Sequence, residues 1–343
     1  MTRWRNWLNL GAMAAAITGM SLIAIKNAPG NVPHQLINVS YDPTRELYQA
    51  LNPLFVASHE KETGRHVVIA QSHGGSSRQA RRIISGEQPA DVVTLGLFSD
   101  IDGLRKRGLI APNWAGRLPN HSLPYTSTIV FVVRRGNPHH VRDWPDLLAS
   151  GLEVVTPDPR TSGNGKLAAL AAWAAAVTRG GSDGEARAYL RSLYQHVPAL
   201  EEGARGAAVS FAIQEIGDVH LTWENEALRE VADSKGKLEI VYPPVSILAE
   251  PYVAWVDAAV ARDGELDDAK AYLTFLFSDE AQETIARLGY RPYKPYAAHK
   301  AGVNFPTLTL APITDIARDW DDANEKFFAE NGVIDIIIGS RRK

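Results

Sequence analysis

The sequence predicts a two-lobed α/β protein with a ligand cleft between the lobes, on three observations. The chain has 343 residues, which is enough for two domains with sizeable cores. Strand and helix patterns alternate along most of it, as in open sheets covered by helices on both faces. A β-branched run at residues 127–133 and a second segment at 245–255 indicate that the chain crosses between two halves and returns. Ligands of such sheets bind beyond the strand ends, so the cleft between the halves is the expected site.

The elements of the first half follow a β-α-β-α-β order, which predicts a parallel sheet. Its strands are expected at residues 36–41, 67–71 and 91–95, and its helices at 44–63, from Ser76, and at 100–107. In the second half we expect strands at 153–157, 217–223 and 238–242, and helices at 167–177, 184–193 and 224–231. Three further helices are predicted at 268–277, 279–288 and 314–330. The expected division is a signal or anchor with its linker at 1–35, a first lobe at 36–123 and 249–340, and a second lobe at 124–248.

Composition excludes several classes of function. Hydrophobic residues make up 45% of the chain and charged residues 22%, with a net charge of −3 and no basic stripe that would indicate a nucleic-acid partner. There is no cysteine, which excludes disulfides, thiolate metal sites, thiol catalysis and lipid attachment at a signal-peptide cysteine. The histidines show no HExxH and no other metal-like spacing, so no metal site is expected.

The N-terminus has the pattern of an export signal. Arg3 and Arg5 precede an uncharged stretch at residues 7–25, and Lys26 ends it. The stretch is also near the length that spans a bilayer, and no clean small-x-small cleavage site follows. A cleaved signal and an uncleaved anchor therefore both remain open, and both deliver the rest of the chain outside the cytoplasm.

Three segments place glycine or serine at the start of an expected helix. Ser162 stands at an N-cap position, Ser76 follows a strand and two glycines, and Gly203 begins a Gly-Ala-Arg-Gly loop before a helix. A helix start offers free backbone N–H groups at the positive end of the helix dipole, which suits an anion. One such segment would indicate only a well-capped helix, whereas three in one chain predict a single anion held among them.

Other motifs point to chemistry less strongly. Residues 163–168 match the GxGxxA dinucleotide pattern, with Asp183 downstream, but they come late in the chain and follow a Pro-x-Pro. Glu224 and Glu226 follow Trp223 in sequence, but carboxylates at i and i+2 do not face each other on a helix, so N-terminal helix charge explains them. No Gly-x-Ser-x-Gly elbow surrounds either Ser76 or Ser162.

A series of motifs in one order then carries a resemblance: INVSYDPTRELY, QSHGGSSRQ, DVVTL, PYTSTIVFVVRRGNP, GARG, GDVHLTWENEA, SILAEP and YRP. Together they resemble the periplasmic sulfate-binding proteins of ABC importers. The resemblance extends from about residue 37 to the final helix, and it is specific because many separate motifs recur in the right order.

The resemblance implies a type II periplasmic-binding-protein fold whose two lobes close by hinge bending on one sulfate. It implies a monomeric receptor in the periplasm, without a cofactor or catalytic residues, that delivers sulfate to the membrane permease of an ABC importer. Carried over position by position, neutral donors would come from Ser76, Ser162, Gly163, Asn164, Ala204 and Trp223. Both serine hydroxyls are expected to face the anion. Asp42 and Arg205 would lie around these groups, and Arg205 would be paired. The Asp42 carboxylate is expected to accept hydrogen bonds from Arg205 or from helix N–H groups.

The sequence departs from the family at two places in the site. Asn164 stands where the family usually has a second glycine, and Ser77-Arg78 replaces a common Gly-Lys pair. These changes could shift the preference toward thiosulfate or another tetrahedral oxyanion. Two further alternatives remain: a membrane-tethered oxyanion sensor, because the signal cleavage site is unclear, and an oxyanion-ester hydrolase with Ser162 as nucleophile.

Overall fold

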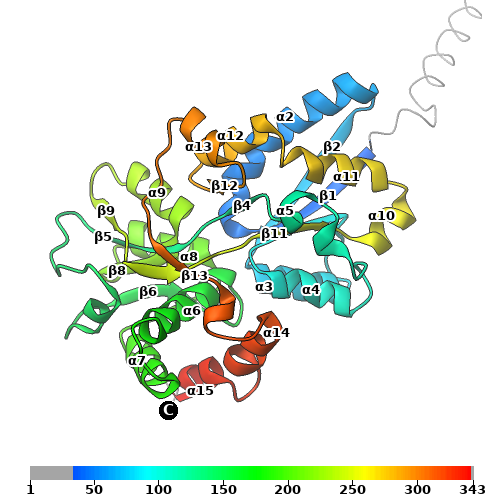
Figure 1. Ribbon diagram of the computed structural model, residues 1–343. Coiled ribbons are helices and arrows are strands. Elements are labelled where there is room, and N and C mark those ends of the chain that lie inside the picture. The colour runs from blue at the N-terminus through cyan, green and yellow to red at the C-terminus, as the bar shows by residue number, and fades with distance from the viewer. Residues whose placement is uncertain (1–33, 341–343) are drawn as a thin grey trace, which may run out of the picture.

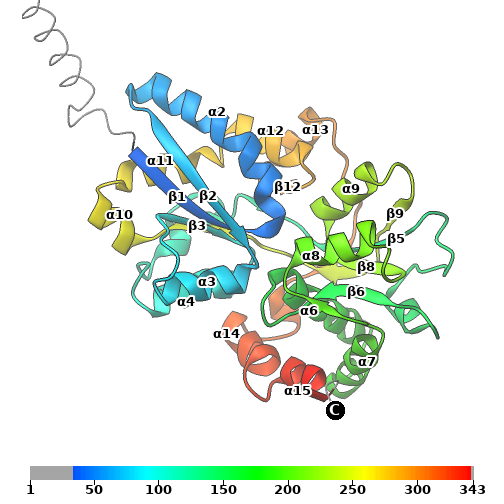
Figure 2. The same ribbon diagram turned by 180° about the vertical axis from the view of Figure 1, so that it is seen from behind.

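The computed structural model describes residues 34–340, which form two α/β lobes (Figures 1 and 2). Residues 1–33 of the predicted signal or anchor and its linker, placed at 1–35, lie outside this part of the chain, so the structure does not bear on them. Within residues 34–340 no helix is both long and apolar enough to cross a membrane.

The first lobe is built on a four-stranded sheet in the order β11-β3-β1-β2. Its strands are β1 (His34–Tyr41), β2 (Val67–Gly74), β3 (Val92–Leu95) and β11 (Tyr252–Trp255). Strand β1 pairs in parallel with both β2 and β3, as the β-α-β-α-β pattern predicts. Strand β11 comes back from the second lobe and pairs antiparallel with β3 at the edge of the sheet.

Helices cover both faces of this sheet, because successive side chains of each strand point to opposite sides. The helices are α2 (Arg45–Thr63), α11 (Leu266–Phe275) and α12 (Asp279–Arg287) on one face, and α3 (Ser76–Ile84) and α4 (Phe98–Lys106) on the other. Within β3, Val92 packs in the cluster under α2 and α11, whereas Val93 packs in the cluster under α3 and α4. The carboxyl end of β2 and the first turn of α3 therefore lie together at the edge that faces the second lobe (Figure 2).

The second lobe contains a five-stranded mixed sheet in the order β7-β6-β8-β5-β9. The strands are β5 (Ile129–Arg134), β6 (Val154–Pro157), β7 (Leu200–Glu201), β8 (Val219–Trp223) and β9 (Leu238–Val241). Its helices are α6 (Gly163–Val177) and α7 (Asp183–Gln195) on one face, and α8 (Ala204–Ala208) and α9 (Glu224–Asp233) on the other. Both faces carry apolar side chains of β5, with Phe131 in the cluster around α6 and Val132 in the cluster around α8 and α9.

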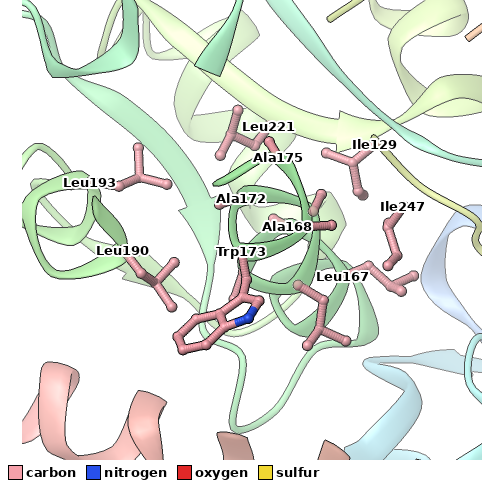
Figure 3. Packing of buried hydrophobic residues seen from close by; sticks show 14 of the residues in the cluster. Ile129, Leu167, Ala168, Ala172, Trp173, Ala175, Leu190, Leu193, Leu221 and Ile247 are labelled. Carbon is pink, nitrogen blue, oxygen red and sulfur yellow. The ribbon is translucent and has the colours of Figure 1, made fainter. Parts of the chain in front are cut away.

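Helix α6 is the centre of the second lobe. It is buried on all sides from Gly163 to Ala175, and Figure 3 shows side chains from β5, β8, β10 and α7 packed around it, with Leu167 and Trp173 projecting from one side. Its many alanines let these neighbours approach the helix closely. The helix begins at Gly163, one turn before the expected start at residue 167, because Ser162 caps it.

The chain crosses between the lobes at the two places that the sequence predicts. Strands β4 (Tyr125–Thr126) and β10 (Val245–Ile247) flank an antiparallel bridge between Ser127 and Ala249. The N–H of Ser127 donates to Ala249 O at 2.9 Å, and the N–H of Ala249 donates to Ser127 O at 3.0 Å. The two crossing segments thus form a paired ribbon between the lobes.

The end of the chain makes a third crossing, which the sequence analysis missed. After β12 (Arg291–Pro292) and α13 (Pro295–Lys300), strand β13 (Thr309–Ala311) pairs with β10, and α15 (Val333–Ser340) lies beside α7 (Figure 1). Phe327 packs on Trp173 of α6 with ring centroids 4.9 Å apart. The residues from Thr309 onward, which the expected division assigned to the first lobe, therefore pack on the second lobe through β10, α6 and α7. Helix α14 (Trp320–Ala323) also contacts α4 of the first lobe, where Asp321 pairs with Lys106. The expected division into lobes stays a prediction.

The single helix predicted at residues 314–330 is wrong. In its place are a 3₁₀ turn (Ile313–Asp315), α14 (Trp320–Ala323), a π-turn (Asn324–Phe328) and α15. The Asp319 side chain accepts from the N–H of Asp322 and starts a new helix, while Asn331 takes a positive φ of 62° before α15. The remaining short helices are α5 (Pro119–Ser122), α10 (Asp257–Asp263), the 3₁₀ turns Asp42–Thr44, Trp114–Gly116 and Trp144–Leu148, and a π-turn at Val209–Ile213.

Candidate functional site

The starts of α3, α6 and α8 meet around one small cavity between the lobes. Its lining consists of Tyr41, Asp42, Pro43, Gly75, Ser76, Ser162, Gly163, Asn164, Ala204 and Trp223. All six residues expected to supply donors are in this set, and so is Asp42. The structure therefore brings together residues that are up to 181 positions apart in the sequence, from Asp42 to Trp223.

The lobes touch closely beside this cavity. A Cβ on Gly75 of the first lobe would lie 2.5 Å from the carbonyl oxygen of Thr161 in the second. A Cβ on Gly163 would lie 3.2 Å from Cβ of Ser76. Tyr41 and Leu97 of the first lobe belong to the same buried cluster as Ile129 and other residues of the second. These contacts describe a closed arrangement of the two lobes around the cavity.

Trp223 presents a donor that has no acceptor. It ends β8, its side chain is fully buried, and its Nε1 has no hydrogen-bond partner among the described residues. The indole stacks at a tilt on Tyr41, with ring centroids 5.2 Å apart, so its position is fixed by packing. A buried donor without an acceptor costs about 1–3 kcal/mol. The cavity beside it is therefore suited to a ligand that accepts hydrogen bonds.

Ser162 is the N-cap of α6, as the sequence predicts. Its Oγ accepts from the N–H of Gly165 at 3.5 Å, which leaves the hydroxyl proton for another acceptor. Position 165 requires glycine because a Cβ there would lie 2.4 Å from the carbonyl oxygen of Pro157. This loop thus directs the first N–H groups of α6 and one hydroxyl to the same place.

Asn164 makes a contact that a glycine at this position would lack. Its Nδ2 donates to the carbonyl oxygen of Leu221 in β8 at 3.0 Å, and its Oδ1 is buried without a partner in the described part of the chain. The side chain ties the start of α6 to the strand that ends in Trp223. The residue lies within the helix and has no positive φ, so the loop dihedrals do not demand glycine here.

The hydroxyl of Ser76 does not have the expected orientation. It does not point to an anion but donates to Asp100 Oδ2 at 2.6 Å, and it accepts from the N–H of Gly96 at 3.0 Å. Asp100, in α4, is buried and also accepts from the hydroxyl of Ser77 at 2.9 Å. A buried carboxylate needs such donors, and this need explains the direction of the Ser76 hydroxyl. In this arrangement Ser76 offers its backbone N–H to the cavity.

Asp42 and Arg205 lie near the start of α8. A Cβ on Gly203 would lie 2.6 Å from Asp42 Oδ2, so the carboxylate packs on the backbone of this loop. Burial raises the pKa of Asp42, while Arg45, Arg78 and Arg205 oppose that shift. Arg205 is paired, as expected, but with Glu46 at 2.9 Å and not with Asp42.

The lining as a whole is suited to an anion that carries no proton. The donors available are backbone N–H groups at three helix starts, the Ser162 hydroxyl and the indole N–H of Trp223. Helix starts carry partial positive charge, and hydrogen bonds to a charged acceptor are about twice as strong as neutral ones. Among the described residues, no lysine or arginine lines the cavity, so dipoles and neutral donors would balance the charge. Sequence reasoning did not identify Tyr41, Gly75 or Asp100, because their places depend on contacts between distant segments.

Comparisons with known proteins agree with this geometry. A family model described as "Bacterial extracellular solute-binding protein" matches residues 39–291. The chain belongs to this family. The sulfate-binding protein of Escherichia coli is 47% identical over 88% of this chain and 92% of its own length. The thiosulfate-binding protein of Pseudomonas aeruginosa is 42% identical over 92% of this chain and 97% of its own.

Among solved structures, the sulfate-binding protein SubI from Mycobacterium tuberculosis superposes with a TM-score of 0.78 and 32% identity. The match covers 86% of this chain and all of that one. The resemblance stated from the motifs is confirmed, and so is the predicted fold class, a two-lobed type II periplasmic-binding-protein fold.

Proposed function

We propose that this solute-binding protein captures sulfate in the cavity between its lobes. The observation that carries the proposal is the buried Nε1 of Trp223, which has no partner among the described residues and lies where three helix starts meet. Sulfate accepts hydrogen bonds on all four oxygens and has no proton to donate near neutral pH. The six donor residues predicted from sequence, namely Ser76, Ser162, Gly163, Asn164, Ala204 and Trp223, are the proposed contacts. The names of the Escherichia coli and Mycobacterium tuberculosis relatives support the choice of anion.

Calorimetry with the full folded chain against sulfate, thiosulfate and phosphate tests this proposal. Sulfate should bind with micromolar affinity or better, about −8 kcal/mol, and the fluorescence of Trp223 should change as the lobes close on it. Replacing Trp223 by phenylalanine keeps an aromatic ring but removes the donor, and should weaken sulfate binding about tenfold or more. If Trp223→Phe binds sulfate as tightly as the parent protein, the indole N–H of Trp223 does not bind the anion.

Thiosulfate is the second candidate ligand. The Pseudomonas aeruginosa relative is named a thiosulfate-binding protein, and Asn164 adds a buried amide oxygen beside the donors. Thiosulfate differs from sulfate by one larger, softer sulfur in place of an oxygen. A small cavity bordered by close backbone contacts between the lobes should favour the smaller anion. Tighter binding of thiosulfate than of sulfate in the same calorimetry would reverse this order.

We also propose the setting in which the receptor works. It is exported to the periplasm, acts as a monomer and passes its ligand to the membrane permease of an ABC importer, as membership in a solute-binding family supports. It is not an enzyme, and an oxyanion-ester hydrolase centred on Ser162 is the alternative that turnover of an aryl sulfate would reveal. The mass of the mature N-terminus separates a cleaved protein from a tethered receptor or sensor.

A further inference from the structure

A buried pair of opposite charges joins the lobes behind the cavity. Lys166 lies in the first turn of α6, in the second lobe, and its Nζ is 4.0 Å from Oδ1 of Asp100 in α4, in the first lobe. The two side chains are 10% and 7% exposed, respectively. Such burial is unusual for lysine and aspartate, which rarely leave water unless they are paired.

Each member of the pair is also close to the anion cavity. Asp100 receives the hydroxyl of Ser76 at 2.6 Å, and Ser76 lines the cavity. Lys166 is two residues after Asn164, which lines it from the other lobe. One carboxylate therefore receives hydrogen bonds from the start of α3 and attracts the cation at the start of α6. The pair links the two halves of the site without touching the ligand.

The surroundings of Lys166 explain why it depends on Asp100. Burial lowers the pKa of Lys166, Asp100 opposes that shift, and Arg81 of the first lobe adds to it. The ring of Phe328 lies 5.0 Å from Nζ and supplies a weak second attraction. Asp100 is thus the carboxylate that pairs with this ammonium group in the closed arrangement. When the lobes separate, both groups can return to water, where each is well solvated without the other.

We propose that Asp100 and Lys166 form an electrostatic latch between the lobes that stabilises the closed state. In this role Asp100 is a positioning residue, because it orients the start of α3 and receives Lys166 only when the lobes have closed. The latch rests on the proposed function, since the ligand whose residence it prolongs is taken to be sulfate.

The latch should act mainly on the rate at which the ligand is released. Removing one member leaves the other buried and unpaired in the closed state only, which favours opening. Lys166→Met keeps the length and apolar volume of the side chain, and should raise the sulfate dissociation rate about tenfold or more with little change in the association rate. Asp100→Asn should act in the same direction.

The double variant Asp100→Asn with Lys166→Met separates a latch from loss of packing. It leaves no uncompensated charge, so its dissociation rate should return to within about threefold of the unaltered protein, giving strong coupling in the double-mutant cycle. A purely structural role of either side chain predicts additive effects instead.

The exposed ion pair between Arg78 and Glu202 provides the matched control, because it also joins the lobes. Glu202 is 81% exposed, so Glu202→Gln should change the dissociation rate less than about threefold. Stopped-flow tryptophan fluorescence gives both rates for all four variants, and circular dichroism confirms that each is folded. A Lys166→Met dissociation rate within threefold of the parent, or additivity in the cycle, overturns the latch.

Failure of the proposed function gives a different result from failure of the latch. If the unaltered protein binds no sulfate, the proposed function is wrong, and the latch is then tested without ligand. Hydrogen exchange at the starts of α3 and α6 should be faster in Lys166→Met than in the parent and should recover in the double variant. Unchanged exchange in Lys166→Met would overturn the latch in that case as well.

Discussion

Ser76 and Ser162 occupy similar places in the two lobes but have different hydrogen-bond partners. Both stand at the start of a helix and line the same cavity. The Ser76 hydroxyl donates to Asp100 and accepts from Gly96, so both of its hydrogen-bonding roles are filled within the first lobe. The Ser162 hydroxyl only accepts, from Gly165, and keeps its proton. One serine therefore builds the frame of its lobe, and the other is free to bind a ligand.

The difference shows that a helix start does not by itself determine what its side chain does. The backbone N–H groups of α3 and α6 are equivalent by geometry, because both follow from the helix. The hydroxyls diverge because a buried carboxylate lies beside one of them and not beside the other. We expect the two lobes to contribute unequally to affinity, with side-chain donors mainly from the second.

The largest expected effect is discrimination between anions. Phosphate keeps a proton near neutral pH and must donate it, while most groups at the cavity also donate. An unsatisfied buried group costs about 1–3 kcal/mol, so sulfate should bind roughly a hundredfold more tightly than phosphate at pH 8. Calorimetry at pH 5 and pH 8 measures both anions. Phosphate within tenfold of sulfate would show that Asp42 or the free Oδ1 of Asn164 accepts its proton.

Ser162→Ala should have the next largest effect on binding. The change removes a hydroxyl donor to a charged ligand, worth about 1.5–3 kcal/mol, so sulfate affinity should fall tenfold or more. It also removes an N-cap, which costs about 1 kcal/mol of stability. Ser182→Ala is the matched control, because Ser182 caps α7 through Glu185 and does not line the cavity. Equal sulfate affinity in both variants would reduce Ser162 to a cap.

Ser76→Ala should lower stability more than it lowers sulfate affinity. Asp100 would lose one of its donors and the N–H of Gly96 would lose its acceptor, so the free energy of unfolding should fall by about 1–3 kcal/mol. Sulfate affinity should change by no more than about threefold, since the backbone N–H remains. Denaturant unfolding and calorimetry give the two values. A tenfold loss of affinity would mean that the hydroxyl turns to the anion when the ligand binds.

The smallest effect on binding is expected at Glu226, a buried carboxyl one turn after Trp223 in the second lobe. Burial raises the pKa of Glu226 to about 8, although Arg229 Nη2 lies 2.7 Å from its Oε2. The folded state then holds a proton that the unfolded chain, with an ordinary pKa of 4.5, releases. This contribution to stability is fully present below about pH 4.5 and is lost as pH rises to about 8.

Glu226→Gln should remove this loss of stability at rising pH, because glutamine stays neutral. The variant should gain stability relative to the parent as pH rises from 5 to 8, by roughly 3 kcal/mol, with unchanged sulfate affinity. Urea unfolding at the two pH values measures it, and Glu87→Gln on the exposed surface is the control. Parallel pH dependence in parent and variant would show that Arg229 keeps Glu226 ionised.

Much of this site was predictable because it depends on local chemistry. The cap at Ser162, the strand that ends at Trp223 and the glycine before α8 follow from short stretches of sequence, and the family motifs assemble them. The partner of Ser76 was not predictable in this way, because Asp100 is 24 positions away and its burial depends on the whole first lobe. The end of the chain was misread for a related reason. Its helical pattern is continuous, but Asp319 and the turn at Asn331 divide it, and packing on Trp173 decides which lobe it joins.

The contact of Gly75 with the carbonyl oxygen of Thr161 has a kinetic consequence. Two stretches of backbone cannot rotate out of the way as a flexible side chain can, so no solute passes between them while the lobes are together. Exchange is then gated: the slowest step of escape is the parting of the lobes, whatever solute is inside. A chase with excess unlabelled anion should give one escape rate, independent of the concentration of the competitor. That rate is also the ceiling on how often one molecule can load, unload and load again without help from another protein.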